Sequence, residues 1–383
     1  MAIKHPSQNH RYCMYIILAQ GKPNGRQNPR AVCDVNHQKA QATGLFATFA
    51  TMIFVTGGTG ILGAQLLCDL AQQGHSIRAM KRSTSDVDWV KKVFSFNQLE
   101  DLWNRVEWVD GDLLDILGLE ELMTGCTQVY HAAAVVSFQS GDEQKLLTHN
   151  IEGTANVVNA CLASGVQKLC YASSIAVFGR EPNRGVVNEE VQWKRTPHNS
   201  NYAVSKYGAE REVWRGTEEG LDAVIVNPSV IVGPCKWDYS SGVLFRSVRN
   251  GLPFYTLGTN GFVDVRDVSK AMTSLMNSDI RNERFILNGA NVVFRDFFNM
   301  VADALKQKRP QIYARPWMSA IAWRVMKPWG WLTGKSPAIT KESVGTAHMT
   351  SLYSSQKIED RLGFSFTPIE DAVERTAEFL GMG

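Results

Sequence analysis

Met52-Ile-Phe-Val-Thr-Gly-Gly-Thr-Gly-Ile-Leu-Gly63 carries the pattern from which the fold class of this chain can be predicted. Its first residues are apolar, as in a buried parallel strand, and a helical pattern begins at Ala64. Between them, Gly57 permits a tight turn, Gly60 lets backbone N–H groups approach a pyrophosphate, and Gly63 lets the helix pack on the strand. The stretch therefore predicts a dinucleotide site with the phosphates at the helix N-terminus. An ordinary strand-to-helix turn is the alternative for this spacing taken alone.

Residues 1–51, which precede this strand, differ in composition from the rest of the chain. They carry six Lys and Arg against one acid, Asp34, with nine Asn and Gln and no sustained helical or strand period. We predict a poorly ordered extension before a domain at 52–383, with translation beginning at Met52 as one interpretation. An organelle-targeting segment is the alternative. A secretory signal is disfavoured because the apolar residues 12–19 are few and lead into Gly-Lys-Pro-Asn-Gly.

Charge and cysteine content argue against several classes of protein. The net charge is +3, of which the extension contributes six minus one, or +5, so the remainder is about −2 and does not indicate nucleic-acid binding. The seven cysteines include no Cys-x-x-Cys pair and no His/Cys cluster, which favours reduced thiols and no metal site. No uninterrupted apolar run reaches the ~20 residues that span a bilayer. We therefore expect a soluble, cytoplasmic protein.

Helical and strand patterns alternate after the glycine turn. A helix over 64–73 is followed by a strand over 76–80, which runs into Lys81 and Arg82. In a dinucleotide fold, the residue that closes this second strand faces the adenosine ribose, where an acid would bind the 2′-hydroxyl of NAD. Lys81 and Arg82 instead offer positive charge to a 2′-phosphate, so NADP(H) is favoured and NAD(H) is the second choice. The alternative is a solvated loop pair.

The remaining pattern predicts an α/β fold: a doubly wound parallel sheet, or Rossmann fold, with a smaller C-terminal substrate lobe. Further strands are expected at 106–109, 128–131, 168–172, 223–227 and 284–287, and helices within 83–105, before 124, and at 243–249, 295–306, 316–326 and 368–380. The nucleotide-binding core should comprise mainly 52–232 and 262–290, and the lobe mainly 180–200, 233–261 and 291–383.

Seven motifs in order make nearly all of 52–383 resemble the extended short-chain dehydrogenase/reductases of the NAD-dependent epimerase/dehydratase superfamily. The motifs are Thr56-Gly-Gly-Thr-Gly-Ile-Leu-Gly63, Gly111-Asp-Leu113, His131-Ala-Ala-Ala134, Asn150-Ile-Glu-Gly-Thr154, Ala172-Ser-Ser174 with Val177-Phe-Gly179, Tyr202-Ala-Val-Ser-Lys206 and Asn227-Pro-Ser-Val-Ile-Val-Gly-Pro234. The family often has Tyr where this chain has Phe178, and Asn where it has His131. Neither position carries the proton transfer, so we expect activity to be retained.

The resemblance implies how the chain holds its cofactor. In the family, the residue matching Asp112 holds the adenine amino group, the one matching Leu113 packs on the ring, and the backbone at 228–230 receives the nicotinamide carboxamide. Asn150 is implied to order the central helix and a water near the catalytic Lys. The expected cofactor-binding residues are Gly57, Thr59, Gly60, Ile61, Leu62, Gly63, Lys81, Arg82, Asp112, Leu113, His131, Ala132, Ala133, Tyr202, Lys206, Pro228, Ser229 and Val230.

Ser174, Tyr202 and Lys206 are the expected catalytic residues, with Asn150 in support. Tyr and Lys four residues apart lie on one face of a helix, so the ammonium can approach both the phenol and the nicotinamide ribose. A phenol with a pKa of about 10 is a poor catalyst at neutral pH, and we expect the ammonium to lower that pKa. Tyr202 would then protonate the developing alkoxide, and Ser174 would hydrogen-bond the substrate oxygen. Ser173 competes for this role, but the family's spacing to Gly179 selects Ser174.

We expect an NADP(H)-dependent oxidoreductase that interconverts a ketone or aldehyde and an alcohol. The resemblance is closest to the dihydroflavonol-reductase and 3-beta-hydroxysteroid-dehydrogenase branch, because the motif at 227–234 lacks the Arg that often precedes it in nucleotide-sugar enzymes. A nucleotide-sugar epimerase or dehydratase with bound NAD is the first alternative. A non-catalytic NADP-binding regulator is the second, although such proteins tend to lose the Tyr that stands at 202.

Aromatic residues near the C-terminus bear on the substrate. Trp317, Ile321, Trp323 and Met326 form a partly amphipathic stripe that ends before Pro328. Core packing is the commoner role for such a stripe, and a membrane-surface helix would need more positive charge. Because the C-terminal lobe of the resembling family closes over the nicotinamide, we expect a small, apolar or ring-shaped substrate. The sequence leaves its identity, the reaction direction and a homodimer open.

Overall fold

A computed structural model of the chain describes residues 52–137, 141–179, 185–196, 199–321, 323–324 and 341–382. All of them belong to one compact unit, residues 50–383. The expected N-terminal extension lies outside the described residues, as does the end of the Trp-rich stripe beyond 324. Within the described ranges, no helix is both long enough and apolar enough to cross a bilayer.

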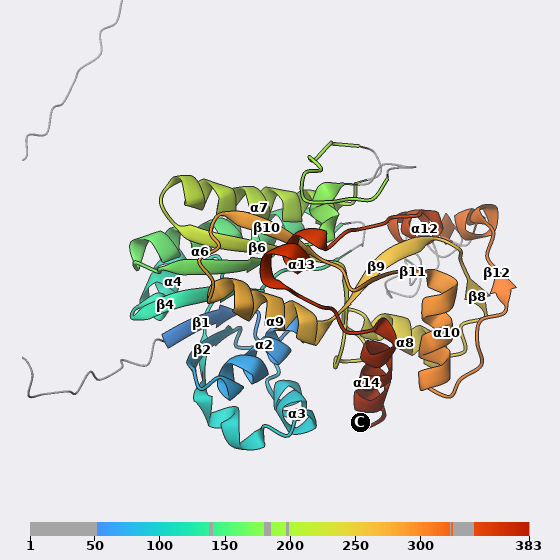
Figure 1. Cartoon of the computed structure of the whole chain (residues 1–383), viewed down its shortest axis with the longest axis horizontal. Helices are drawn as coiled ribbons and strands as arrows, with labels where there is room; N and C mark the ends of the chain where they lie inside the picture. The colour runs from blue at the N-terminus through green and yellow to red at the C-terminus, as the bar shows by residue number, and fades with distance from the viewer. Residues whose placement is uncertain are drawn as a thin grey trace, which may run out of the picture. The chain divides into compact units, whose positions relative to one another are not determined.

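Seven parallel strands form the central sheet, which confirms the predicted Rossmann architecture (Figure 1). Their order is β10-β6-β5-β4-β1-β2-β3, so the direction of winding reverses between β1 and β4. Ligands of such sheets bind at the carboxyl ends of the strands beside this reversal. The strands are β1 (Met52–Thr56), β2 (Ser76–Lys81), β3 (Val106–Asp110), β4 (Cys126–His131), β5 (Lys168–Ala172), β6 (Asp222–Pro228) and β10 (Glu283–Leu287).

Helices cover both faces of the sheet (Figure 1). α2 and α9 share one apolar cluster, while α4, α6 and α7 contribute to a second cluster on the opposite face. Because both faces are covered, the central strands are buried throughout, and Ile53, Phe54 and Val55 of β1 have no exposed surface. These helices are α2 (Ile61–Gln72), α4 (Ile116–Met123), α6 (Gly153–Ala163), α7 (Asn201–Glu218) and α9 (Val265–Met276).

Short helical segments complete this part of the chain. The insertion expected to be helical over 83–105 contains α3 (Asp88–Phe96) and the 3₁₀ segment η1 (Glu100–Arg105). α5 (Glu143–Leu146) and the π-helical turn η2 (Leu147–Glu152) precede α6, and η3 (Ile175–Phe178) follows β5. η2 contains Asn150, and Ser174 lies immediately before η3, so both segments bring in residues of the expected active site.

A smaller lobe has its own apolar core, in which Phe245, Phe262 and Phe297 are fully buried. A three-stranded sheet in the order β11-β9-β7 runs through it, and a two-stranded sheet joins β8 to β12. The elements are β7 (Val230–Val232), α8 (Gly242–Arg249), β8 (Phe254–Tyr255), β9 (Thr259–Asp264), β11 (Ala290–Val293), α10 (Phe294–Ala304), β12 (Ile312–Tyr313), α12 (Lys341–His348) and α14 (Ile369–Gly381). α13 (Gln356–Leu362) instead packs beside β10 of the central sheet, where Ile358 joins the central apolar cluster.

Most predicted boundaries lie close to the observed ones. α2 begins at Ile61 rather than at 64, because the Gly60 carbonyl already accepts the Ala64 amide at 2.9 Å. The helix predicted over 316–326 is present over 316–321 and at 323–324, and the other residues of that range lie outside the described ones. The sequence did not indicate β8 or β12, which are two residues long and carry no readable period.

Candidate active site

The glycine turn packs against the small residues that follow β4. Gly57 has φ of +76°, and a Cβ at this position would lie 2.5 Å from the Ala133 amide nitrogen and 2.6 Å from the Ala132 carbonyl carbon. A Cβ on Gly63 would lie 2.1 Å from the Gly57 oxygen. Both positions therefore require glycine. No side chain caps the N-terminus of α2 at Gly60, so the first helical N–H groups can face an anion.

The adenosine end of the expected site contains an acid that the sequence argument did not consider. Lys81 Nζ lies 2.5 Å from Asp110 Oδ1, because the parallel register pairs the last residues of β2 and β3. The predicted preference for NADP(H) rested on Lys81 and Arg82 and did not include this partner on β3. Arg82 is exposed beside the pair. Two cations and one carboxylate thus share this edge of the sheet.

Asp112 and Leu113 follow β3 on the same side of the switch point. Asp112 is exposed, and its Oδ1 accepts the Leu114 amide at 3.0 Å, which fixes the turn and leaves the second carboxylate oxygen outward. Leu113 is held against α6, where Asn156 Nδ2 donates to its carbonyl at 2.9 Å. Their contact with the adenine, which the resemblance implies, stays a prediction.

His131, one of the residues expected to bind the cofactor, has a fully buried side chain. Nδ1 lies 2.6 Å from Thr56 Oγ1, Nε2 lies 3.0 Å from Thr154 Oγ1, and the ring stacks on Tyr171. Burial, with the positive charge of Lys206 second, lowers the pKa of His131 to about 3, so the imidazole is neutral. The side chain packs between the strand ends and α6, and the assignment of residue 131 to the cofactor site stays a prediction.

Ser174 and Tyr202 come together, as the catalytic hypothesis requires. Ser174 follows β5 and accepts the Ala176 amide at 3.1 Å, and its side chain also hydrogen-bonds Tyr202. Ser173, the competitor, is buried and donates to Glu210 Oε2 at 2.6 Å. Its hydroxyl is therefore engaged in the interior, and the geometry favours Ser174 as the residue that faces a substrate.

The pKa of Tyr202 is shifted in the direction opposite to the expected one. Burial raises this pKa, and the hydrogen bond with Ser174 opposes the rise. The expected direction was a fall caused by the Lys206 ammonium. The reason for the difference is the burial of the phenol, which disfavours its charged form.

Lys206 is fully enclosed between α7 and the end of β5. Its Nζ donates to the Tyr171 hydroxyl at 2.7 Å and to the Ala172 carbonyl at 2.8 Å, and it lies 4.4 Å from the centroid of the Tyr171 ring. Burial lowers the pKa of Lys206 to about 7, and the negative charge of Glu210 opposes that fall. The amine thus titrates near neutral pH.

Asn150 fastens the chain after β4 to α7. Its Oδ1 accepts the Val135 amide at 2.7 Å, and its Nδ2 donates to the Val135 carbonyl at 2.9 Å and to Ser205 Oγ at 2.9 Å. Ser205 is the residue before Lys206. Asn150 therefore joins this segment directly to α7 at the residue before Lys206.

The nicotinamide end of the expected site carries an unsatisfied polar group. Pro228 and Ser229 are buried, Val230 is partly exposed, and the Ser229 amide donates to the Leu287 carbonyl at 2.9 Å. Ser229 Oγ is buried without a hydrogen-bond partner among the described residues. A buried hydroxyl without a partner is costly unless a ligand satisfies it. This hydroxyl, the glycine cradle and the uncapped helix together fit a nicotinamide dinucleotide.

Sequence reasoning missed Tyr171 and Thr154 as parts of the site. Tyr171 joins Lys206 to Thr154, which in turn contacts His131. Every residue of β5 is buried, so no period-two pattern distinguishes the inward side chains, although Tyr171 lies only three residues before Ser174. Across the described ranges, no group of three His, Cys, Asp or Glu side chains is placed to hold a metal ion.

A family model for the NAD dependent epimerase/dehydratase family matches residues 53–287 of the chain. A putative dihydroflavonol 4-reductase from Synechocystis sp. is 29% identical over 356 residues, which cover 89% of this chain and 95% of that protein. Sterol demethylase protein B from Methylococcus capsulatus is 31% identical over 268 residues, covering 68% of this chain and 77% of that protein.

A solved structure shows the same fold at lower sequence identity. It is a UDP-glucuronic acid 4-epimerase from Bacillus cereus in complex with UDP-glucuronic acid and NAD, which superposes with a TM-score of 0.68 at 18% identity. The match covers 87% of this chain and 99% of the epimerase.

Proposed function

Because the chain belongs to the NAD dependent epimerase/dehydratase family and is an NAD(P)-dependent oxidoreductase, we propose that it reduces an apolar ketone or aldehyde with NADPH. Tyr202 is the proton donor in this proposal. The observation that carries it is the hydrogen-bonded pair Ser174 and Tyr202, one helical turn from the buried Lys206. Side chains of this kind beside a dinucleotide cradle suit proton transfer to a carbonyl oxygen while the carbonyl carbon receives a hydride.

The cofactor would supply that hydride when bound. The glycine turn and the N-terminus of α2 would hold its pyrophosphate, Lys81 and Arg82 its adenosine phosphate, and Ser229 its nicotinamide amide. The remaining chemistry belongs to side chains of this protein.

Ser174 and Tyr202 carry the proton chemistry at the substrate oxygen. Ser174 donates a hydrogen bond to the carbonyl oxygen, which polarises the bond and fixes its orientation. Because burial raises the pKa of Tyr202, its phenol is protonated at neutral pH and can act as an acid. The phenolate left behind is stabilised by Ser174 and by the positive charge of Lys206 on the same face of α7.

Cofactor choice is testable at the edge formed by β2 and β3. Replacing Lys81 and Arg82 by Ala should weaken NADPH binding by about 1–3 kcal/mol, the scale of a charge-assisted hydrogen bond, and leave NADH binding nearly unchanged. Fluorescence titration with each cofactor measures both effects. The exposed lysines Lys91 and Lys92 on α3 provide a charge-matched control pair. Equal losses for the two cofactors would contradict the NADP preference.

An apolar substrate is supported by the lobe and by one relative. Trp317 and Ile321 are 60% and 54% exposed, which disfavours core packing for these two members of the stripe. A nucleotide-linked sugar would instead require Arg or Lys clamps for its diphosphate. The name of one relative refers to sterols, which are apolar and ring-shaped.

A substrate screen tests this proposal. NADPH oxidation is followed with a panel of hydrophobic ketones and aldehydes and, in parallel, with nucleotide sugars. We expect turnover of apolar carbonyls. Efficient turnover of a nucleotide sugar, with no reaction of apolar carbonyls, would contradict the proposal.

The alternative function is that of a nucleotide-sugar epimerase. It is supported by the fold that this chain shares with an NAD-bound epimerase. Such an enzyme retains its cofactor through the reaction. Mass spectrometry of small molecules released from the purified protein distinguishes the two. Retained NAD favours the epimerase, whereas a protein that is purified empty and takes up NADPH favours the reductase.

A further inference from the structure

Glu210 is a carboxylate buried in α7 with three hydrogen-bond donors from outside its own helix. Its side chain is 3% exposed. Ser173 Oγ donates to it at 2.6 Å, Asn227 Nδ2 at 2.8 Å and Arg284 Nη1 at 3.1 Å. A buried carboxylate requires such partners to stay ionised. Glu210 takes no part in the proton transfer proposed for Ser174, Tyr202 and Lys206.

Two of these donors lead directly to the catalytic serine. Ser173 precedes Ser174 in the chain, so its hydrogen bond to Glu210 holds the backbone from which the catalytic hydroxyl projects. Asn227 Nδ2 also donates to the Ser174 carbonyl at 3.3 Å. Glu210 therefore fixes the Ser174 backbone at two neighbouring points.

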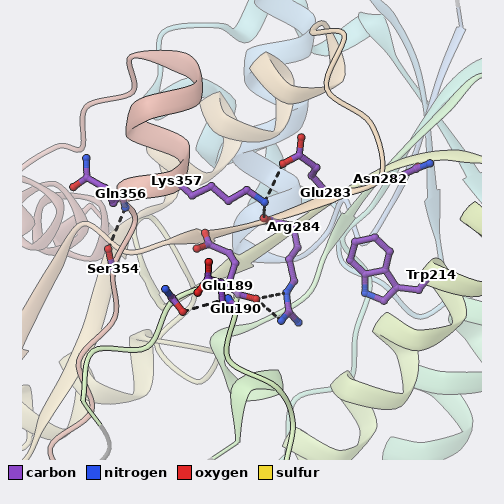
Figure 2. A pocket seen from close by; sticks show the side chains of 10 residues that line it. Glu189, Glu190, Trp214, Asn282, Glu283, Arg284, Ser354, Gln356 and Lys357 are labelled. Atoms are coloured by element: carbon purple, nitrogen blue, oxygen red, sulfur yellow. Dashed lines mark hydrogen bonds and ion pairs between the residues drawn. The ribbon is translucent and has the colours of Figure 1, made fainter.

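Arg284, which lies on β10, is the counterion of Glu210. It is held independently of Glu210, because it donates to the Glu189 carbonyl at 2.6 Å and the Val191 carbonyl at 3.1 Å and stacks over the Phe178 ring. Figure 2 shows Arg284 among the side chains that line a pocket, with Glu189 close to it. The Arg284 guanidinium thus lies between this pocket and the buried carboxylate of Glu210.

Glu210 also lies one helical turn after Lys206, on the same face of α7. Tyr171 from β5 and His131 from β4 interact with Lys206, and on α7 itself Tyr202 and Glu210 lie one helical turn before and after it. Since the imidazole is neutral and both phenols are protonated at neutral pH, Glu210 is the negative charge in this set.

We propose that Glu210, held by Arg284, is a positioning residue of the active site that orients Ser174 and keeps Lys206 in its cationic form. This inference rests on the proposed function, because it takes Lys206 to contact the cofactor ribose and Ser174 to contact the substrate. A purely structural ion pair would hold the fold together without affecting the titration of Lys206.

The test is the pH dependence of cofactor binding in Glu210→Gln. Gln keeps the shape and one acceptor oxygen but removes the charge, so Lys206 should lose its proton at lower pH. A neighbouring opposite charge shifts a pKa by about 1–3 units, so we expect the midpoint of the alkaline loss of NADPH affinity to fall by about one unit. Fluorescence titration across the pH range measures it. Turnover should also fall by about 10-fold or more, because Ser174 loses part of its support.

Glu212→Gln is the matched control, because Glu212 lies on the same helix and pairs with Arg215 at the surface. Its midpoint should equal that of the wild type. An unshifted midpoint in Glu210→Gln would overturn the proposal. If that variant folds poorly because Arg284 is left without a counterion, the double variant Glu210→Gln with Arg284→Met removes the uncompensated charge. A lowered midpoint in the double variant supports the proposal, and a wild-type midpoint overturns it.

The outcome is separable from that of the proposed function. If the wild type binds NADH rather than NADPH, the same titration is made with NADH. A wild type that binds neither coenzyme would defeat the proposed function. An unshifted midpoint defeats only the role of Glu210.

Discussion

Tyr202→Phe is expected to reduce carbonyl reduction by about 10²–10⁴-fold, the usual contribution of a positioned acid. The substitution keeps the ring that packs at the start of α7 and removes only the hydroxyl. Because Ser174 retains its contact with Ala176, the loop after β5 should keep its conformation. NADPH affinity should therefore remain within about twofold, and the loss should appear in kcat rather than in cofactor binding.

Tyr207→Phe provides the matched control for this experiment. Tyr207 lies on the same helix, and its ring stacks on Trp193 with a centroid separation of 4.6 Å. Loss of its hydroxyl should leave turnover near the wild-type level. Near-normal turnover in Tyr202→Phe would leave the proposed mechanism without its acid, whatever the control shows.

Local sequence patterns were sufficient to predict the sheet. Each central strand is a short apolar run that ends at a turn, and each cover helix carries a broad apolar face, so both periods are readable in the sequence. The motif at 202–206 likewise predicts its own geometry, because residues four apart on a helix are neighbours. Such features depend only on residues close in sequence.

Contacts set by strand register could not be predicted in the same way. Asp110 reaches Lys81 because β2 and β3 end together, and His131 meets Thr56 because β4 pairs with β1. The sequence identifies each strand but not which residues lie side by side across the sheet. The same limit concealed Tyr171, whose partner Lys206 comes from α7.

The predicted direction for the pKa of Tyr202 was wrong. The prediction rested on charge alone, with the neighbouring ammonium expected to dominate. In the folded protein burial dominates, and Lys206 itself is a weak source of charge near neutral pH because its own pKa falls to about 7. Desolvation depends on the packing around a group, which a motif does not report.

Lys206→Met should impair both turnover and cofactor binding, which distinguishes it from Tyr202→Phe. Met keeps the length of the side chain but removes the donor to the ribose, so NADPH binding should weaken by about 1.5–3 kcal/mol. Lys168→Met is the matched control. Lys168 is also buried and donates to two carbonyls, those of Leu275 and Ser278, but it lies at the other end of β5. Its loss should lower stability and leave cofactor affinity unchanged.

The pH dependence of stability provides an independent test of the buried amine. Its pKa is lowered from 10.5 in the unfolded chain to about 7 in the folded protein. Between these values the unfolded chain binds more protons, so the wild type should gain stability as the pH rises through this window. Lys206→Met lacks this gain, so its stability relative to the wild type should fall between about pH 7 and about pH 9. Urea unfolding of both proteins at the two pH values measures the difference. A difference that stays constant would show that the amine is not titrating there, and Lys206 would then be a permanent cation whose charge the surrounding groups fully stabilise.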